Sequence, residues 1–240
     1  EDHLRLQMIM AGSNFPKLWD AVNSIDNEME NELEFAYSNR FGYLTACPTN
    51  VGTGIRCSVM IHLPGLVFSR KIEQVLNAVA KMGMTVRGFA GEGSEVVGNL
   101  FQISNQWTLG ISEQDTIDKM QNVVTNIINQ ERQAQTDLYE ENRVMIEDKV
   151  WRAYATLSHA RIISTSESVE LFSVLRLGRN LGILHNPTYE DINKMILETR
   201  PAHLQKRAEK SLSPSERDEH RAEMIRKWIG NGLGSNQNQV

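Results

Sequence analysis

The sequence predicts an α+β protein in which a mixed part of strands and helices precedes an all-helical part. Up to about residue 130, short β-branched and apolar runs alternate with segments of helical periodicity; after it, only helical periodicity remains. At 240 residues the chain is long enough for one or two domains with cores of their own. We expect a first domain over residues 1–132, a helical extension over 133–230 and a disordered polar tail over 231–240.

The mixed part is bounded by clear turn and capping residues. Gly83 ends one expected helix, glycines fill the loop at 91–98, and Ser112 with Asp115 makes a capping pair at the start of a long helix. The expected elements are, in chain order, a helix over 16–35, strands over 43–47 and 56–63, a helix from Ser69 to Gly83, strands over 85–89 and 100–104, and a long helix from Ser112.

The helical part carries its own start and stop signals. Ser213-Pro214-Ser215-Glu216 combines an N-cap, a proline at the first helical position and a glutamate at the third, which strongly predicts a helix start. The expected helices are one over 144–157, one over 166–177 closed by Gly178, one opened by Thr188, and one from Ser213 to Gly230.

Composition excludes several classes of protein. The net charge of −5 argues against direct nucleic-acid binding by the whole molecule, and no apolar run approaches the roughly 20 residues of a membrane span. There is no signal peptide, and Cys47 and Cys57 form neither a Cys-x-x-Cys pair nor part of a zinc ligand set. These features favour a reducing cytoplasm. The chain lacks an initial methionine, so we interpret it as a fragment of a longer protein.

The segment Tyr43–Pro64 is the most informative in the chain. Cys47 precedes a Pro-Thr-Asn turn, two glycines (Gly52 and Gly54) follow, and Arg56 opens an apolar run. A thiol, exposed backbone amides and a fixed cation suit a site that handles phosphate and a cationic substrate. From the spacing alone, a strand–loop–strand with a buried cysteine is an equal alternative.

This segment resembles the signature of the ATP:guanidino phosphotransferases, the family of arginine and creatine kinases. Residues 1–7 resemble the Asn-Glu-Glu-Asp-His-x-Arg motif of the family without its first two residues, and 86–95 resemble its flexible acidic substrate loop. Residues 101–105 resemble the strand that follows that loop. Arg217-Asp218-Glu219-His220-Arg221-Ala222 resembles the Arg-Asp-x-x-Arg-Ala motif of one branch, the bacterial protein arginine kinases of McsB type. The resemblance implies an antiparallel sheet flanked by helices in the first domain.

The resemblance also implies the catalytic residues. Glu1 matches the catalytic glutamate of the family and Cys47 its active-site cysteine. Glu92 and Glu95 are both candidates for a second carboxylate: alignment favours Glu95, while the nearby glycine hinge keeps Glu92 open. Carboxylates aligned with a guanidinium orient it and accept its proton during attack. The competing interpretation of the loop glutamates is solvated surface charge, and Cys57 is expected to be an inert packed thiol.

ATP is the implied phosphoryl donor. Arg5 and Arg56 match arginines that bind its phosphates, since guanidinium stays charged and its forked donors fit phosphate oxygens. Without the motifs, each would be interpreted as part of a surface salt bridge. Ala90 stands where the family often has another arginine, and Met60 where it often has a histidine near adenine. Mg²⁺ is expected to arrive on the nucleotide, because the sequence has no dedicated metal site.

A second group of residues, Arg217, Asp218 and Arg221, is implied to bind phosphoarginine. Positions four apart share one face of a helix, so two arginines would clamp the phosphate while Asp218 accepts from the guanidinium. A plain amphipathic helix explains the same pattern.

The expected function is that of a protein arginine kinase, which transfers the γ-phosphate of ATP to arginine side chains and so marks proteins for a Clp-type protease. The implied partners are protein substrates with exposed arginines, an activator or adaptor protein, the protease, and a second copy of the chain in a homodimer; no membrane or nucleic acid is implied. One alternative is an inactive fragment that only binds phosphoarginine. The other is a small-molecule guanidino kinase, although those lack the helical extension.

Overall fold

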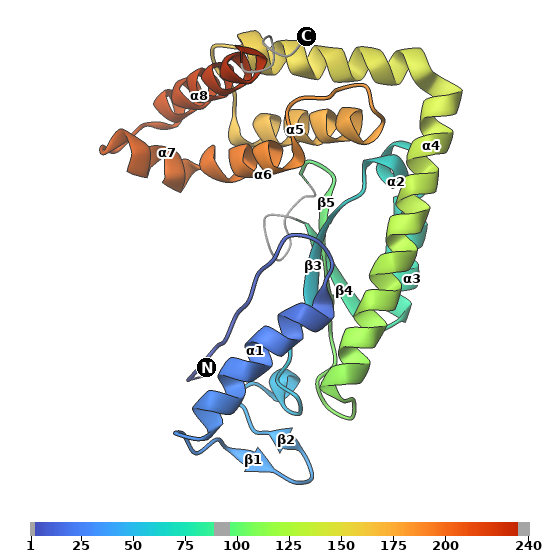
Figure 1. Cartoon of the computed structure of the whole chain (residues 1–240), viewed down its shortest axis with the longest axis vertical. Coiled ribbons are helices and arrows are strands. Elements are labelled where there is room, and N and C mark those ends of the chain that lie inside the picture. The colour runs from blue at the N-terminus through green and yellow to red at the C-terminus, as the bar shows by residue number, and fades with distance from the viewer. Residues whose placement is uncertain (1–2, 89–96, 235–240) are drawn as a thin grey trace. The chain divides into compact units, whose positions relative to one another are not determined.

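The computed structural model describes residues 3–88 and 97–234 (Figure 1). The chain divides into two compact units, and the division does not follow a single cut in the sequence. The first unit is made of Glu1–Ile61, Lys71–Ser94 and Phe101–Gln130, and the second of His62–Arg70, Glu95–Leu100 and Glu131–Val240. From Glu131 onward the chain belongs to the second unit, and this point lies next to the expected domain boundary at 132. Two short segments of the expected first domain, His62–Arg70 and Glu95–Leu100, also belong to the second unit.

The fold combines helices with antiparallel strands, as the sequence predicts. The strands are β1 (Tyr37–Ser38), β2 (Gly42–Tyr43), β3 (Ser58–His62), β4 (Met84–Gly88) and β5 (Leu100–Asn105). The helices are α1 (Phe15–Glu30), the 3-10 helix η1 (Pro48–Asn50), α2 (Pro64–Phe68), α3 (Ile72–Lys81), α4 (Glu113–His159), α5 (Thr165–Asn180), α6 (Tyr189–Glu198), α7 (Pro201–Ala208) and α8 (Pro214–Gly234).

The first unit is built on a three-stranded sheet of order β3-β5-β4 and a small antiparallel pair, β1 and β2. In the larger sheet, β4 and β5 pair antiparallel with Val86 opposite Ile103. Helix α3 contacts β4, and the first half of α4 supplies further apolar side chains. The core of this unit contains Val75, Val79, Met84, Ile103, Ile117, Met120 and Val124, all of which are buried.

The second unit is a helical assembly in which successive helices contact each other: α5 with α6, α6 with α7, and α7 with α8. An edge-to-face pair of Phe172 on α5 and Trp228 on α8, with ring centroids 6.2 Å apart, joins the first and last of them. Its core contains Leu157, Ile163, Phe172, Leu175, Leu177, Ile192 and Ile225, all buried.

Three helix starts agree with their capping signals. Ser112 accepts from the backbone N–H of Asp115 at 3.1 Å. Thr188 and Asp191 form a reciprocal capping box. Ser213 accepts from Glu216 N–H, and the Glu216 carboxylate accepts from Ser213 N–H, at 3.3 and 2.8 Å. Each pair satisfies backbone donors that a helix end leaves without an intrahelical partner.

Several expected boundaries are wrong. The first helix ends at Glu30, only Tyr43 of the strand expected over 43–47 is paired in β2, and α2 and α7 were not expected. The two long helices expected on either side of residue 140 are one helix, α4, with a kink at Asn142 (φ −134°, ψ 35°). Helix α8 continues beyond Gly230 to Gly234, so part of the expected tail is helical, and 235–240 lie outside the described residues.

Gly178 does not close its helix. It lies inside α5, and an added Cβ would lie only 2.5 Å from a methyl carbon of Val150 on α4. A glycine at this position lets α4 and α5 approach each other closely. In the sequence it cannot be told from a C-cap glycine, because both positions require a residue without a side chain.

Candidate functional site

Cys47 lies at the start of η1, in the loop that follows β2. Its thiol is half-buried, and its Sγ lies 3.0 Å from the Thr49 hydroxyl oxygen. The backbone carbonyl of Cys47 accepts hydrogen bonds from the Thr45 hydroxyl at 2.7 Å and from the Asn50 N–H at 3.0 Å. These bonds fix the backbone of a residue whose thiol remains accessible to a reagent or a substrate.

Thr108, which the sequence interpretation did not single out, holds this loop in place. Its buried hydroxyl lies within hydrogen-bond distance of the carbonyls of Thr49 (2.9 Å) and Val51 (2.8 Å), and its own carbonyl accepts from Thr53 N–H at 2.9 Å. Gly52 passes so close that an added Cβ would lie 2.1 Å from the Thr108 carbonyl oxygen, and its φ is +115°. Only glycine fits there.

Arg56 is exposed, and Asn105 at the end of β5 fixes the backbone on both of its sides. The Asn105 side-chain oxygen accepts from Cys57 N–H at 2.7 Å, and its amide donates to the Ile55 carbonyl at 3.0 Å. The Asn105 side chain thus forms hydrogen bonds with a backbone group of the residue before Arg56 and of the residue after it. The only signal in the sequence is that Asn105 ends the strand resembling that of the family.

The two cysteines differ in environment. Cys57 is buried, as expected, and burial raises the pKa of its thiol to about 12. The nucleophilic form of a cysteine is the thiolate, so Cys57 is unreactive at neutral pH. Cys47 is the accessible thiol of the two.

The remaining expected catalytic residues are placed only in part. Arg5 is exposed in a segment without regular structure that precedes α1. Arg5, Cys47 and Arg56 all belong to the first unit. Glu1, Glu92 and Glu95 lie outside the described residues.

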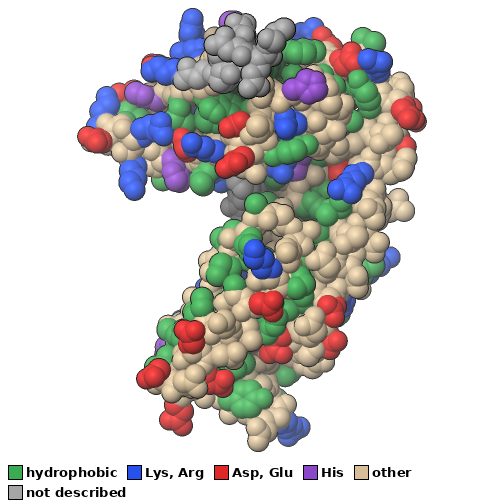
Figure 2. Space-filling model, in the orientation of Figure 1, with side chains coloured by type: hydrophobic (Ala, Val, Ile, Leu, Met, Phe, Trp, Pro, Cys, Tyr) green, Lys and Arg blue, Asp and Glu red, His purple; other side chains and the backbone are tan. Residues whose placement is uncertain are grey.

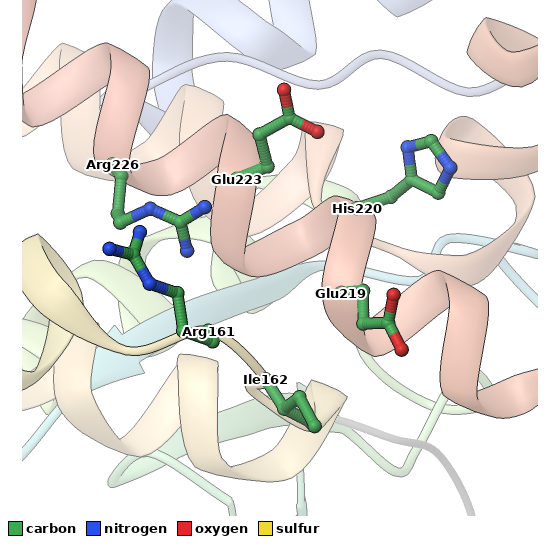
Figure 3. Close-up of a pocket in the computed structure, with 6 residues that line it drawn as sticks. All are labelled: Arg161, Ile162, Glu219, His220, Glu223 and Arg226. Atoms are coloured by element: carbon green, nitrogen blue, oxygen red, sulfur yellow. The ribbon is translucent and has the colours of Figure 1, made fainter.

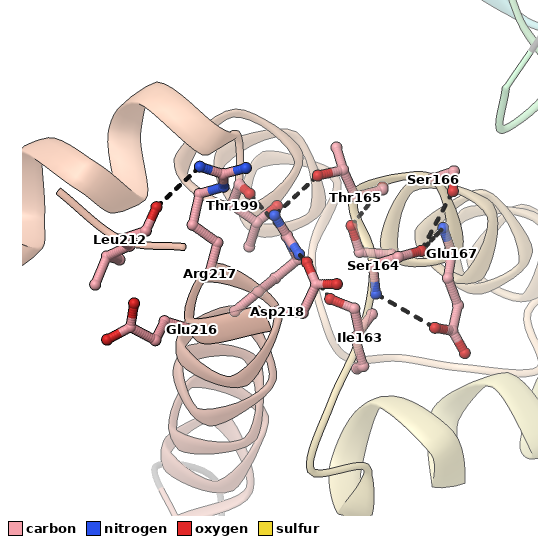
Figure 4. Close-up of polar contacts among 12 residues, drawn as sticks. Ile163, Ser164, Thr165, Ser166, Glu167, Thr199, Leu212, Glu216, Arg217 and Asp218 are labelled. Atoms are coloured by element: carbon pink, nitrogen blue, oxygen red, sulfur yellow. Dashed lines mark hydrogen bonds and ion pairs between the residues drawn. The ribbon is translucent and has the colours of Figure 1, made fainter. Parts of the chain in front are cut away.

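Arg221, the last arginine of the Arg-Asp-x-x-Arg-Ala motif, is completely buried. Its Nε donates to the Thr199 carbonyl at 3.0 Å, and its terminal nitrogens donate to the Ile163 carbonyl at 2.6 Å and the Thr165 hydroxyl at 2.8 Å. It also pairs with the Asp218 carboxylate one turn earlier on α8. Figure 4 shows these neighbours around the start of α8.

Arg217 and Arg221, which the helical spacing places on one face of α8, differ in their exposure. Arg217 is half-buried, and one of its guanidinium nitrogens donates to the Leu212 carbonyl at 3.0 Å. Four of the five guanidinium donors of Arg221 are used inside the protein. In this arrangement Arg221 fixes the Asp218 carboxylate and ties α8 to the segments at 163–165 and 199.

A separate hollow of about 380 Å³ lies on another face of α8 and is lined by Arg161, Ile162, Glu219, His220, Glu223 and Arg226. Figure 3 shows the Arg161 and Arg226 guanidinium groups facing each other there. Arg226 also donates to the Ala160 carbonyl, and the Glu223 carboxylate pairs with Lys227 at 2.6 Å.

Basic side chains are also gathered over α7 and α8, as Figure 2 shows. Those on α7 are His203, Lys206 and Arg207, which are exposed. Such a surface suits an anionic partner. Among the described residues, no group of three or more His, Cys, Asp or Glu side chains could hold a metal ion. None of the described helices combines the length and hydropathy that a membrane span requires.

The comparisons with known proteins identify the class to which this fold and loop belong. Residues 1–134 match the family described as ATP:guanido phosphotransferase, C-terminal catalytic domain. That match covers more than half of the chain, so the chain belongs to the ATP:guanido phosphotransferase family. Residues 143–239 match the domain described as the protein-arginine kinase McsB C-terminal domain. The family resemblance drawn from the motifs is confirmed.

Two curated relatives show how much of such a protein is present. The chain is 47% identical over 231 residues to a protein-arginine kinase of Pelotomaculum thermopropionicum, covering 96% of this chain and 65% of that protein. It is 46% identical over 226 residues to a protein-arginine kinase of Halothermothrix orenii, covering 94% and 65%. The chain thus spans about two-thirds of their length. A crystal structure of lombricine kinase is 33% identical and covers 48% of this chain and 31% of its own, with a TM-score of 0.41.

Proposed function

We propose that this chain is part of an ATP-dependent protein arginine kinase that phosphorylates arginine side chains of other proteins. The observation that carries the proposal is that one chain holds both a guanido phosphotransferase catalytic match and a protein-arginine kinase C-terminal match. The kinship with relatives of that name at 46–47% identity supports it. A small-molecule guanidino kinase is disfavoured, because the helical domain would have no assigned use.

The proposed reaction is an in-line phosphoryl transfer. A guanidinium nitrogen of the substrate attacks the γ-phosphorus of ATP, the N–P bond forms, and the bond to the β–γ bridging oxygen breaks to release ADP. The proton lost from the guanidinium goes to a carboxylate, for which Glu1, Glu92 and Glu95 are the proposed candidates. The products are a protein phosphoarginine and ADP. Mg²⁺ is proposed to enter on the phosphates of the nucleotide, whose charge it neutralises.

Arg5 and Arg56 are proposed to bind the ATP phosphates, and Cys47 to face the substrate guanidinium. The exposed position of Arg56 and its rigid backbone, fixed by Asn105, suit this role. A fixed cation aligned with a polyanion stabilises charge without reorganising during the reaction.

Mass spectrometry at neutral pH tests the activity, because phosphoarginine is lost in acid. The full-length protein, incubated with ATP and a protein substrate, should yield phosphoarginine, and a Cys47→Ser variant should lose most of it while keeping its fold. Cys57→Ser is the matched control and should be mild. If the full-length wild type yields none, the proposal fails. Activity of the 240-residue chain alone would separate an active catalytic fragment from a binding module.

Calorimetry tests the ATP site in the full-length protein. Arg56→Ala should weaken ATP binding by about 1.5–3 kcal/mol, the typical value of a hydrogen bond to a charged group. Asn105→Ala should weaken it in the same direction, because both backbone flanks of Arg56 are released. Arg40→Ala is the control: Arg40 is another exposed arginine of the first unit, stacked over the Phe41 ring. Unchanged affinity in the Arg56 variant would reject the assignment.

We further propose that the motif on α8 binds phosphoarginine, with Arg217 and Asp218 as the contacting side chains and Arg221 as their support. This version is supported by the burial of Arg221 and by its pairing with Asp218. Titration of free phosphoarginine should show that Arg217→Ala binds far more weakly, whereas Arg226→Ala, from the separate hollow on α8, binds normally. If only the Arg226 variant loses binding, the ligand lies in that hollow instead.

The wider role is a proposal that follows from the reaction. Phosphoarginine on a protein is a recognisable chemical mark, and we propose that it directs proteins to a Clp-type protease, with an adaptor protein and a homodimer as further partners.

A further inference from the structure

The hollow on α8 contains two arginines that have no acidic partner. Arg161, between α4 and α5, and Arg226, on α8, turn their guanidinium groups toward each other there (Figure 3). Neither forms an ion pair within the part of the chain that the structure describes. Two like charges that face each other are unfavourable, and an anion between them replaces the repulsion with two attractions. The arrangement therefore suits an oxyanion.

Other surface arginines of the second unit are neutralised by a carboxylate. Three exposed ones each form an ion pair: Arg143 with Glu147, Arg152 with Asp148, and Arg207 with Glu198. Glu223, a carboxylate of the hollow itself, pairs with Lys227 at 2.6 Å instead of with an arginine of the hollow. The two positive charges of Arg161 and Arg226 thus remain available to a ligand.

The wall of the hollow is fixed by bonds within the protein. One guanidinium nitrogen of Arg226 donates to the carbonyl of Ala160, the residue before Arg161. The backbone is held on both sides of Arg161, because the Ala160 N–H donates to a carbonyl of α4 at 2.8 Å and the Ile163 N–H donates to a carbonyl of α8 at 3.2 Å. Groups that are already in place lose less conformational freedom when a ligand binds.

The charge and size of the hollow narrow the class of anion. Two guanidinium groups match the roughly two negative charges of a phosphoryl group near neutral pH, and their forked donors fit its oxygens. A single carboxylate would leave one positive charge unmatched. The volume of about 380 Å³ is that of a small-molecule site, and the exposed carboxylate of Glu219, which lies away from the two arginines in Figure 3, disfavours an extended polyanion.

We propose that this hollow is a second anion site on α8, which binds a phosphoryl dianion between Arg161 and Arg226. Where the phosphate is carried on a larger molecule, the rest of that molecule lies toward Glu219. Water weakens both contacts, because Arg161 is exposed and Arg226 half-buried, so we expect a dissociation constant on the order of 1 mM. A titration of phosphoarginine at micromolar concentrations therefore still reads the motif of Arg217 and Asp218. Binding in the hollow requires no phosphoryl transfer and is independent of the proposed function.

Arginine labelling tests the site in the full-length protein. Phenylglyoxal modifies guanidinium groups, and mass mapping gives the rate at each arginine. Inorganic phosphate at about ten times the expected dissociation constant should slow the modification of Arg161 and Arg226 about ten-fold, compared with chloride at equal ionic strength. Arg207, outside the hollow, should react at an unchanged rate. Acetate, a monoanion, should protect far less, and equal protection by acetate would overturn the assignment to a dianion.

Variants show whether the two arginines act together. Arg161→Gln should abolish the protection of Arg226 by phosphate without disturbing the fold, since the Arg161 side chain is exposed and has no ion pair among the described residues. Arg152→Gln is the matched control and should keep the protection. The proposal is wrong if phosphate leaves both arginines of the hollow unprotected, if it slows Arg207 equally, or if Arg226 stays protected in the Arg161 variant.

Phosphoethanolamine, in which an ammonium group accompanies the phosphate, distinguishes the sources of the dianion. If it protects Arg161 and Arg226 at a lower concentration than inorganic phosphate does, and Glu219→Gln removes that advantage, the hollow takes a phosphate carried on a small molecule. If inorganic phosphate protects as well or better, free phosphate is the ligand. Both results support a phosphoryl site, whereas protection by neither compound overturns it.

Discussion

Single side chains fix the backbone of the segment that carries Cys47 and Arg56. Thr108 and Asn105 hold backbone atoms of a segment that lies about 50 residues earlier in the chain. Each buried hydrogen bond of this kind contributes about 1 kcal/mol, and losing one partner costs more because the other is left unsatisfied. The position of Cys47 and Arg56 therefore depends on residues that have no reactive group of their own.

Cysteine labelling should separate the two thiols. Cys47 is half-buried on a loop, whereas Cys57 is buried with its pKa raised to about 12, so iodoacetamide at pH 7.5 should modify Cys47 first. Mass mapping of the modified peptides gives the order. Cys47→Ser should abolish the fast phase. Equal rates at both cysteines would contradict the environments described here.

The stability of the chain should fall in mild acid because of His62. Its pKa is lowered from 6.5 to about 3 in the folded state, so the fold favours the neutral ring. The stabilisation is complete above pH 6.5 and is lost progressively as pH falls from there towards 3. Urea unfolding at pH 7.5, 6.0 and 5.0 measures the slope, and His62→Asn should reduce it. An unchanged slope in that variant would assign the acid sensitivity to other groups.

At the scale of elements, close contacts and buried polar groups position the helices more than apolar periodicity does. Gly178 lets α5 approach α4, and Glu131 on α4 caps the short helix α2 by accepting from the N–H groups of Gly65 and Leu66 at 2.7 and 2.9 Å. Tyr139 donates to Glu147 at 2.8 Å across the kink at Asn142, which helps to hold the bend in α4. Arg143, which follows the kink, donates to the same carboxylate at 2.8 Å.

Arg221 should be essential for the docking of α8. Arg221→Ala removes four donors from a site with no exposure and leaves the Thr199 and Ile163 carbonyls unpaired. We expect a loss of roughly 3 kcal/mol or more in the free energy of unfolding. Arg217→Ala, the matched control on the same helix, should cost under about 1 kcal/mol, since its guanidinium is half-buried. Urea denaturation of both variants provides the comparison, and equal losses would show that the burial of Arg221 is not stabilising.

At the scale of the whole molecule, the two units share the chain in an interleaved way. The segments His62–Arg70 and Glu95–Leu100 come from the sequence range of the first domain but belong to the second unit. Leu63 and Leu66 in the first of them are 0% and 2% exposed. A boundary drawn once in the sequence therefore separates residues that pack together.

A fragment of residues 1–132 should show that the two units are interleaved along the chain. It lacks Ser173 and Gln135, so His62 and Asn99 lose their bond to α5 and the cap at Glu131 loses one of its donors. We expect rapid amide exchange over 62–70 and 97–100 in the fragment compared with the full chain. A fragment with a cooperative thermal transition and native exchange in those segments would contradict the interleaving.

The sequence by itself determined the family, the α+β class and the capped helix starts. Motifs and caps are local: the residues that make the Cys47 turn or the Ser213 box are neighbours in the chain, so their pattern can be recognised without a fold. The long helix α4 and Gly178 show the limit. A kinked continuous helix and two separate helices have the same apolar periodicity. The sequence also does not distinguish a glycine that ends a helix from a glycine that lets a second helix pack closely against it.

Only the tertiary structure decided which side chains support the site. Helical spacing places Arg217 and Arg221 on one face, but burial of that face against Ile163 and Thr199 turns Arg221 into an internal support. Asn105, Thr108 and Ser173 bond atoms about 50 to 111 residues away. Such partners are chosen by how elements pack, because a buried donor or acceptor must be satisfied by whatever the fold brings within about 3 Å of it.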